Sequence, residues 1–259
     1  MKIAVSGLVN IETSVKVRGF PIAYYPIDYA FFGVKSVVSG VALNIAKSLA
    51  VLGNEPTLIS FLGNDPEGSR ILAELNANGL STEGFFPRLS ETPTSVVLYE
   101  SSGRRQIYCD LKDIQDQTLA FHDASPMIRD CEWVVLCNVN FNRTLIREIK
   151  AAGKQIATDV HVISDIDDAY NRDFMEHADL LFLSDENIIG EPETFLLHLK
   201  DRYPASVIAI GRGEHGALLY DRKRDEMTRF SAAKVGPVVN TIGAGDALFS
   251  SFLSYAMRG

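Results

Sequence analysis

Residues 39–79 read SGVALNIAKSLAVLGNEPTLISFLGNDPEGSRILAELNANG, in which two longer amphipathic segments flank a short apolar run at 55–63. The same alternation begins with KIAVSG at 2–7 and returns from residue 131 onward with CEWVVLCNV, NRTLIREIKAAG, KQIATDVHV, ADLLFLS, EPETFLLHLKDRYP and SVIAIG. Strands that alternate with helices in this way indicate βαβ units and a mostly parallel sheet covered by helices. The sequence therefore predicts the α/β class.

Two stretches interrupt this alternation. Residues 12–39 are rich in β-branched and aromatic residues without a helical period, and residues 94–109 read as two strands around a Ser-Gly turn. Together they predict a small β-appendage. Its aromatic residues are expected to pack against the protein rather than to contact a ligand, although a flap that covers a cleft and pairs with a second subunit would use the same side chains: Tyr24, Tyr25, Tyr29, Phe31 and Phe32.

The composition fits one globular unit with a small-molecule partner. The chain has 259 residues, of which 46% are hydrophobic, and it contains no internal repeat or long linker, so we expect a single domain over 1–259. The net charge is −8 and the basic residues are scattered, which argues against nucleic acid or an anionic membrane as partner. No apolar run approaches the length of a membrane span or a secretory signal, so the cytoplasm is the expected location.

The cysteines and histidines show no metal-ligand or disulfide pattern. Cys109, Cys131 and Cys137 form no CxxC pair and are odd in number, so they are predicted to be core thiols. The five histidines have no ligand spacing, which argues against a dedicated zinc site.

The motif GRGEHG at 211–216 matches the glycine pattern of a dinucleotide-binding turn and follows a good strand. Such a turn must open a helix whose N-terminus meets the pyrophosphate. Here the next residues, ALLYDRKRDEMTRF, read as two short strands around a charged turn, so we reject the dinucleotide interpretation. Two interpretations stay open for Gly213 and Gly216: a tight loop beside a nucleotide, or turn residues alone.

The stretch NTIGAGDALFSSFLSYAMRG at 240–259 carries the chemistry. From Asp246 onward its apolar residues fall on one helical face, so a helix is predicted with its N-terminus at Gly243–Ala244–Gly245. Free backbone N–H groups at such a start make an anion site. Asp246 alone would serve as a cap or favour the helix dipole. Two glycines and an alanine beside it favour phosphoryl transfer, which needs an anion cradle and a base together.

TIGAGDALF at 241–249 and SGVALNIAKSLAVLG at 39–53 resemble the C-terminal and N-terminal signatures of the PfkB, or ribokinase-like, family of carbohydrate kinases. Further similar stretches follow in the family's order: GLVNIE, FLGNDPEG, TPTSVVLYESSGRRQIY, ADLLFLSDEN and GEHGALLY. The resemblance implies a three-layer α/β/α fold with a mostly parallel central sheet and a small β-lid, whose strands come from about 12–39 and 94–109.

The resemblance also implies an ATP-dependent kinase that uses Mg²⁺ and phosphorylates a hydroxyl, expected to be a primary alcohol, of a monosaccharide or related sugar. Asp246 would be the general base, and the N–H groups of Gly243, Ala244 and Gly245 would hold the transferring phosphoryl. No residue is assigned as a direct metal ligand. The implied nucleotide-binding positions are Gly213, Gly216, Asn240, Thr241, Ser184 and Asn187, and the implied substrate-binding positions are Asn10, Glu12, Gly40 and Asn44.

The residues themselves leave some alternatives. An Asx turn or a cap would also explain Asn10 and Glu12, whereas an amide at Asn44 inside a helical run needs partners and so favours a functional role. Arg105, at a hairpin tip, is expected to be a solvated lid charge.

Several positions depart from the family pattern. Asn240 stands where Asp is usual, Ser184 and Asn187 replace an Asn-x-x-Glu pair beside Asp185 and Glu186, and Glu12 replaces a shorter Asp. These changes predict weaker Mg²⁺ binding and a reshaped acceptor pocket. Relatives usually continue past the helix that ends this sequence, which leaves open a shortened sequence or a trimmed member. The alternatives are a nucleoside kinase of the same family or a non-catalytic sugar- or nucleotide-binding protein, and a homodimer through the lid is considered.

Overall fold

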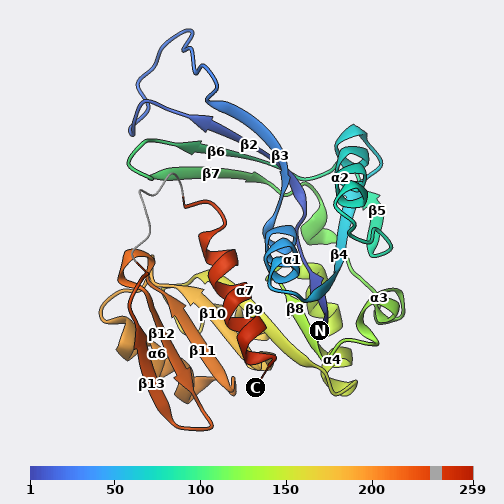
Figure 1. Cartoon of the computed structure of the whole chain (residues 1–259), viewed down its shortest axis with the longest axis vertical. Helices are drawn as coiled ribbons and strands as arrows, with labels where there is room; N and C mark the ends of the chain where they lie inside the picture. Colours follow the sequence, from blue (N-terminus) through green and yellow to red (C-terminus); the bar gives the residue numbers. More distant parts are fainter. Residues whose placement is uncertain (234–240, 259) are drawn as a thin grey trace.

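A nine-stranded sheet forms the centre of the protein (Figure 1). The computed structural model describes residues 1–233 and 241–258. In spatial order the strands are β13 (Glu226–Phe230), β12 (Ala217–Asp221), β11 (Val207–Gly211), β10 (Leu180–Ser184), β9 (Gln155–Val162), β8 (Trp133–Leu136), β1 (Lys2–Ser6), β4 (Glu55–Gly63) and β5 (Phe85–Leu89). Neighbouring strands from β11 to β5 in this order pair in parallel, and the pairs β11–β12 and β12–β13 are antiparallel.

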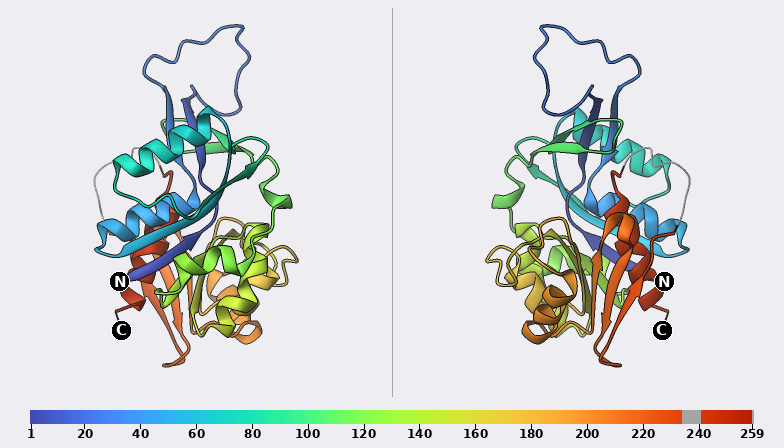
Figure 2. Two further views of the ribbon diagram at one scale, coloured as in Figure 1. Left: turned by 90° about the vertical axis from the view of Figure 1, so that its right-hand side faces the viewer. Right: turned by 90° about the vertical axis from the view of Figure 1, so that its left-hand side faces the viewer.

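Helices cover both faces of this sheet, as the two side views in Figure 2 show. One face carries α1 (Val41–Val51), α2 (Pro66–Ala77) and α7 (Ala244–Ala256). The other carries α3 (Phe121–Ile128), α4 (Arg143–Ala151), α5 (Arg172–His177) and α6 (Pro192–Arg202). The predicted three-layer α/β/α architecture is confirmed.

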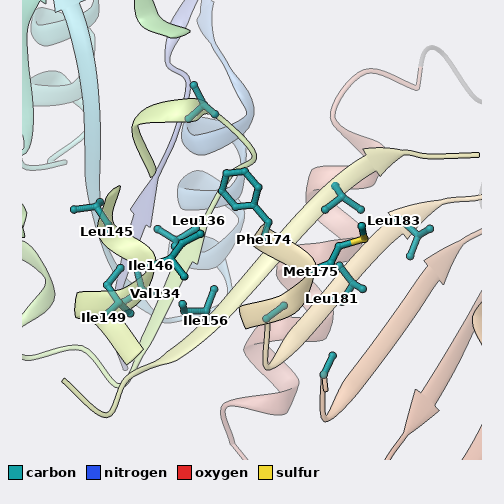
Figure 3. Close-up of a cluster of buried hydrophobic side chains, with 14 of the residues drawn as sticks. Val134, Leu136, Leu145, Ile146, Ile149, Ile156, Phe174, Met175, Leu181 and Leu183 are labelled. Atoms are coloured by element: carbon teal, nitrogen blue, oxygen red, sulfur yellow. The ribbon is translucent and has the colours of Figure 1, made fainter. Parts of the chain in front are cut away.

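The core consists of two apolar clusters, one on each face of the sheet. Because both faces of the inner strands are covered, these strands read as continuous apolar runs rather than as alternating patterns. Figure 3 shows the first cluster, in which Phe174 and Met175 of α5 and the apolar face of α4 pack against β8, β9 and β10. This packing fixes the carboxyl ends of the strands, where ligands bind in open parallel sheets.

A second, four-stranded sheet lies apart from the central one, at the top of Figure 1. Its order is β3 (Val34–Ser39), β2 (Asn10–Lys16), β6 (Thr94–Tyr99) and β7 (Arg105–Asp110), and we call it the lid. The strands lie at the two ends of the predicted segment 12–39, while residues 17–33 contain none. Pro21 and Pro26 in this segment supply no backbone N–H for a strand ladder.

The aromatic residues of the 17–33 loop do not pack as predicted. Tyr24 is 87% exposed, Phe31 82% and Phe32 99%. Tyr29 stacks on Phe31, its exposed neighbour in the loop, with ring centroids 5.8 Å apart. The prediction is wrong because the loop extends away from both sheets, as Figure 2 shows, which leaves these side chains exposed.

The cysteine prediction holds for two of three thiols. Cys131 and Cys137 are buried, whereas Cys109 is exposed. Cys109 lies on β7, an edge strand of the lid whose six residues are all exposed. No disulfide is formed by these thiols.

Candidate active site

The N-terminus of α7 forms an open turn. Gly243 is the N-cap in a left-handed conformation, with φ 73°, and no side chain caps the helix. The Ala244 N–H donates to the Thr241 carbonyl at 3.2 Å. A Cβ atom at Gly245 would meet nothing within 4 Å, so the space beside the backbone is open. The N–H groups of a helix start are left without intrahelical partners and attract anions. The turn therefore fits a phosphate.

Asp246 lies in the first turn of α7 and is 9% exposed. The Asn44 side-chain amide, on α1, donates to its Oδ2 at 2.8 Å. A Cβ built at Gly243 would lie 3.8 Å from Asn44 Nδ2 and 4.0 Å from Asp246 Oδ2, which places the carboxylate beside the anion turn. Burial raises the pKa of Asp246, and the Asn44 hydrogen bond only partly opposes it. A buried carboxylate of this kind is a stronger base than a solvated one.

Asp159 and His161, at the carboxyl end of β9, belong to the same site and were missed in the sequence. The His161 N–H donates to Asp159 Oδ1 at 2.7 Å, and His161 Nδ1 lies 3.5 Å from Asp159 Oδ2. Although burial favours the neutral imidazole, Asp159 raises the pKa of His161 to about 8. Both side chains act electrostatically on Asp246. Their position at the end of a buried parallel strand was the available signal.

Asn10 and Glu12 lie on β2 at the entrance of the lid sheet. Asn10 is 4% exposed and donates through Nδ2 to Ser95 Oγ at 2.9 Å. Its Oδ1 has no hydrogen-bond partner among the described residues. Burial raises the pKa of Glu12, whose Oε2 accepts from Ser39 Oγ at 3.3 Å. A buried acceptor without a donor is what a ligand hydroxyl would satisfy.

The backbone conformation and close packing at Gly40 require glycine. Its φ is 111°, and a Cβ there would lie 2.5 Å from the Leu8 carbonyl oxygen. The Ala42 N–H donates to the same carbonyl at 3.1 Å, so Gly40 lets α1 begin directly against the segment that follows β1. Asn44 lies one turn further along this helix.

A cavity of about 800 Å³ lies between α7 and strands β11–β13. Gly213 and Gly216 are part of its wall, and a Cβ at Gly216 would lie 1.9 Å from the Phe230 carbonyl oxygen. After these glycines the chain continues as strand β12, which agrees with rejecting a dinucleotide-binding turn. Apolar side chains from both sides complete the wall: Leu219, Phe230, Leu248, Phe252 and Tyr255.

Ser184 and Asn187 follow β10 at the same edge of the sheet. Ser184 Oγ accepts from the Glu186 N–H at 3.4 Å, and Asp185 Oδ2 lies 3.7 Å from Arg212 Nε. Within the described ranges, no three His, Cys, Asp or Glu side chains are grouped to hold a metal. Mg²⁺ at phosphoryl-transfer sites is held by one or two carboxylates together with substrate phosphates, so this sparse set fits only a metal that arrives with a nucleotide. Asn240 lies outside the described residues.

The contact of Arg105 differs from the predicted solvated lid charge. It is exposed, as expected for a lid residue, but its Nη1 donates to Thr241 Oγ1 rather than facing solvent alone. Thr241 lies two residues before Gly243, the first residue of the anion turn. The lid therefore contacts the start of α7.

The whole chain, residues 1–259, matches the pfkB family carbohydrate kinase profile. The chain belongs to the pfkB family of carbohydrate kinases. The N-terminal and C-terminal signatures of this pfkB-family chain meet where Asn44 bonds Asp246. Among its described helices, none combines the length and apolar character needed to cross a membrane.

Known relatives of this pfkB-family chain act on several acceptors. An acarbose 7(IV)-phosphotransferase from an Actinoplanes species is 25% identical over 255 residues, covering 97% of this chain and 83% of the relative. A ribokinase from Dictyostelium discoideum is 23% identical, covering 98% and 86%. A solved microbiome-derived acarbose kinase superposes with a TM-score of 0.88 at 24% identity, covering 99% and 85%. The structural match shows a shared fold.

Proposed function

We propose that this protein transfers the γ-phosphoryl of ATP to a hydroxyl, in particular a primary alcohol, of a monosaccharide or related sugar. The observation that carries the proposal is the buried Asp246 carboxylate beside the open turn of Gly243, Ala244 and Gly245. Phosphoryl transfer depends mainly on positioning and on stabilisation of charge, and these two features supply a base and rigid N–H donors in one helical turn.

In the proposed step the acceptor oxygen attacks the γ-phosphorus and its proton moves to Asp246. The bond from the γ-phosphorus to the bridging oxygen breaks, and ADP leaves with that oxygen. The N–H groups of Gly243 and Gly245 hold the phosphoryl oxygens, and the Ala244 N–H joins them once it leaves the Thr241 carbonyl. Asn44 keeps the Asp246 carboxylate aligned. Mg²⁺ bound with ATP would neutralise phosphate charge, with Asp185 and Glu186 as the nearby carboxylates beside Ser184.

The two ends of the site suggest where each substrate binds. Gly213 and Gly216 at the cavity of about 800 Å³ favour the adenosine part of ATP on that side of α7, with Thr241 near its phosphates. Asn10 and Glu12 favour a sugar substrate between β2 and Asp246, because the buried Asn10 Oδ1 and the half-buried Glu12 carboxylate can accept hydrogen bonds from its hydroxyls. Acarbose-phosphorylating relatives support a sugar or glycoside acceptor.

Two alternatives keep support. A nucleoside acceptor is favoured by the fold similarity to a solved nucleoside kinase in complex with inosine, with a TM-score of 0.77 at 19% identity. A binding protein without efficient transfer is favoured by Ser184 and Asn187 in place of the usual metal-positioning pair.

The test is ADP release from ATP and Mg²⁺ over a panel of aldoses, ketoses, sugar acids, glycosides and nucleosides. Asp246→Asn should lower kcat by about 10²- to 10⁴-fold, the usual contribution of a general base. Asp123→Asn is the matched control, because Asp123 lies in the first turn of α3 on the opposite face of the sheet. Equal turnover in Asp246→Asn and wild type would refute the assignment. Ligand binding by calorimetry without any phosphorylated product would favour the binding-protein alternative.

The lid and the thiols support two further parts of the proposal. Exposed edge strands and the aromatic loop are suited to pair two copies into a homodimer through the lid. Three free thiols and the use of ATP fit the cytoplasm, where thiols stay reduced. Sedimentation that shows a monomer at high protein concentration would remove the dimer.

A further inference from the structure

Glu12 lies on the face of the lid that is turned toward the start of α7. In the lid sheet Glu12 pairs with Ser95, and Ser95 pairs with Cys109, so these three side chains form one row on one face. Side chains four residues apart on a strand share a face, and Arg105, four residues before Cys109, donates to Thr241. The row therefore faces the candidate active site, in agreement with the position of the lid above the N-terminal end of α7 in Figure 1.

The Glu12 carboxylate has no cationic partner among the described residues. Burial raises its pKa, and the hydrogen bond from Ser39 Oγ at 3.3 Å only partly opposes this shift. Burial also raises the pKa of Asp246 and of Cys109, and the negative charge of Glu12 adds to both shifts. In the described part of the lid, the basic residues on the same face form no ion pair with Glu12: Lys16, Lys35 and Arg105.

Asn10 adds an unsatisfied acceptor beside Glu12. It lies two residues earlier on β2, on the same face of the lid, and is 4% exposed. Its Nδ2 donates to Ser95 Oγ at 2.9 Å, whereas its Oδ1 has no hydrogen-bond partner among the described residues. A buried acceptor without a donor is costly, so a ligand is expected to donate to it. The Asn10 oxygen and the Glu12 carboxylate thus both require a hydrogen-bond donor.

A protonated amine matches these two groups better than a neutral hydroxyl does. An ammonium group has three N–H donors and no acceptor, and it brings the positive charge that Glu12 lacks. A hydroxyl has one donor and leaves the charge of Glu12 unbalanced. The His161 imidazolium acts on Asp246, but Glu12 is not among the groups that it affects. Hydrogen bonds from ammonium to carboxylate are roughly twice as strong as those between neutral groups.

We propose that the acceptor of this protein is an amino sugar, whose ammonium group donates to the Glu12 carboxylate and to Asn10 Oδ1. This inference rests on the proposed kinase activity and narrows its substrate class. The amine is not the phosphorylated group and keeps its protons. A hydroxyl of the same sugar gives its proton to Asp246 as its oxygen bonds the γ-phosphorus and ADP leaves.

The first test measures binding without nucleotide, so it does not depend on catalysis. Calorimetry compares glucosamine, kanosamine and galactosamine with glucose and galactose, and includes N-acetylglucosamine, which keeps the nitrogen without the charge. At least one amino sugar should bind wild type about 10- to 100-fold more tightly than its parent sugar, the contribution of one hydrogen bond between charged groups. Acetylation and Glu12→Gln should each remove this preference. A panel in which no amino sugar binds more tightly than its parent overturns the inference.

The matched control is Asp110→Asn. Asp110 follows Cys109 on β7, so its side chain faces the other side of the lid, where it pairs with Lys112 at 2.6 Å. This variant should keep the preference for the amino sugar, and thermal melting checks that both variants are folded. Loss of the preference in Asp110→Asn to the same extent as in Glu12→Gln would contradict a direct contact with Glu12.

The second test separates this inference from the kinase proposal. With ATP and Mg²⁺, kcat/KM should favour the amino sugar in wild type and lose this preference in Glu12→Gln. If neutral sugars are phosphorylated as efficiently as their amino forms, the inference is overturned and the kinase proposal stands. If an amino sugar binds selectively through Glu12 but is not phosphorylated, the ligand class is supported and the kinase proposal fails.

Discussion

Replacing Gly40 by Ala should damage the site through the position of α1. The Cβ would lie 2.5 Å from the Leu8 carbonyl oxygen, and ordinary contact begins at 3.4 Å, so the start of α1 must move by about 0.9 Å. Asn44 lies one turn further on and holds Asp246 at 2.8 Å. A misplacement near 1 Å at a catalytic group can cost about 100-fold in rate, which is the expected loss in kcat.

The same change should lower the free energy of unfolding by two contributions. A non-glycine residue at φ 111° costs about 1–3 kcal/mol, and overpacking against the Leu8 carbonyl adds about 1–3 kcal/mol. Urea denaturation measures the loss of stability, and steady-state kinetics on the same preparation measures the loss in kcat. A typical domain has about 5–15 kcal/mol of stability, so the variant should stay folded at low temperature.

Gly53→Ala is the matched control, because Gly53 lies just after the other end of α1 with φ 81° and nothing within 4 Å of its Cβ position. It should lose only the strain of a left-handed alanine, about 1–2 kcal/mol, and keep its kcat. The reasoning is refuted if Gly40→Ala keeps wild-type kcat, or if it loses no more stability than Gly53→Ala.

Three other changes can be predicted. Because burial raises the pKa of Asp246, its ionised form destabilises the fold at neutral pH, and Asp246→Asn should increase the free energy of unfolding at pH 7. Urea titrations should show that this gain in stability disappears toward pH 4, where the wild-type carboxyl is protonated as well. A lower free energy of unfolding for Asp246→Asn at pH 7 would contradict the prediction. Asp159 raises the pKa of His161 to about 8, so kcat/KM should fall above pH 8 as the imidazolium loses its proton. If a His161→Asn variant shows the same decrease at alkaline pH, the decrease does not come from His161. If the lid pairs two copies, Phe31→Ser with Phe32→Ser should convert a sedimenting dimer to a monomer without lowering kcat strongly; an unchanged dimer would place the interface elsewhere.

Local sequence patterns predicted the layers of the fold. Alternating strand and helix segments predicted a parallel sheet, and the glycines before Asp246 predicted where α7 begins. Both features could be predicted because each depends on residues that are close together in the sequence. The family resemblance assigned both Asn44 and Asp246 to the predicted site, although they are 202 residues apart in the chain. No spacing rule connects residues at that separation.

The incorrect predictions and the site residues that were not predicted have a common physical cause. Whether Arg105 faces water or Thr241 depends on the position of the lid hairpin relative to α7. The residues of the hairpin alone do not determine that position. Phe31 and Phe32 look like packing residues by type, but the loop that carries them leaves the core. Asp159 and His161 lie near the end of an ordinary buried strand, β9, and only the neighbouring α7 makes their carboxylate and imidazole part of a site.

The contact between α1 and α7 also has a consequence for synthesis of the protein. Besides the bond between Asn44 and Asp246, Asn54, which lies just after α1, donates through Nδ2 to Ser254 Oγ of α7 at 2.9 Å, across 200 residues. A chain emerging from the ribosome therefore carries its first helix long before the partner that completes the site. Such long-range contacts are slow to form, and until α7 docks, the part of α1 that α7 covers is exposed to water. Ribosome-bound chains that end before α7 should therefore be inactive and should recruit chaperones.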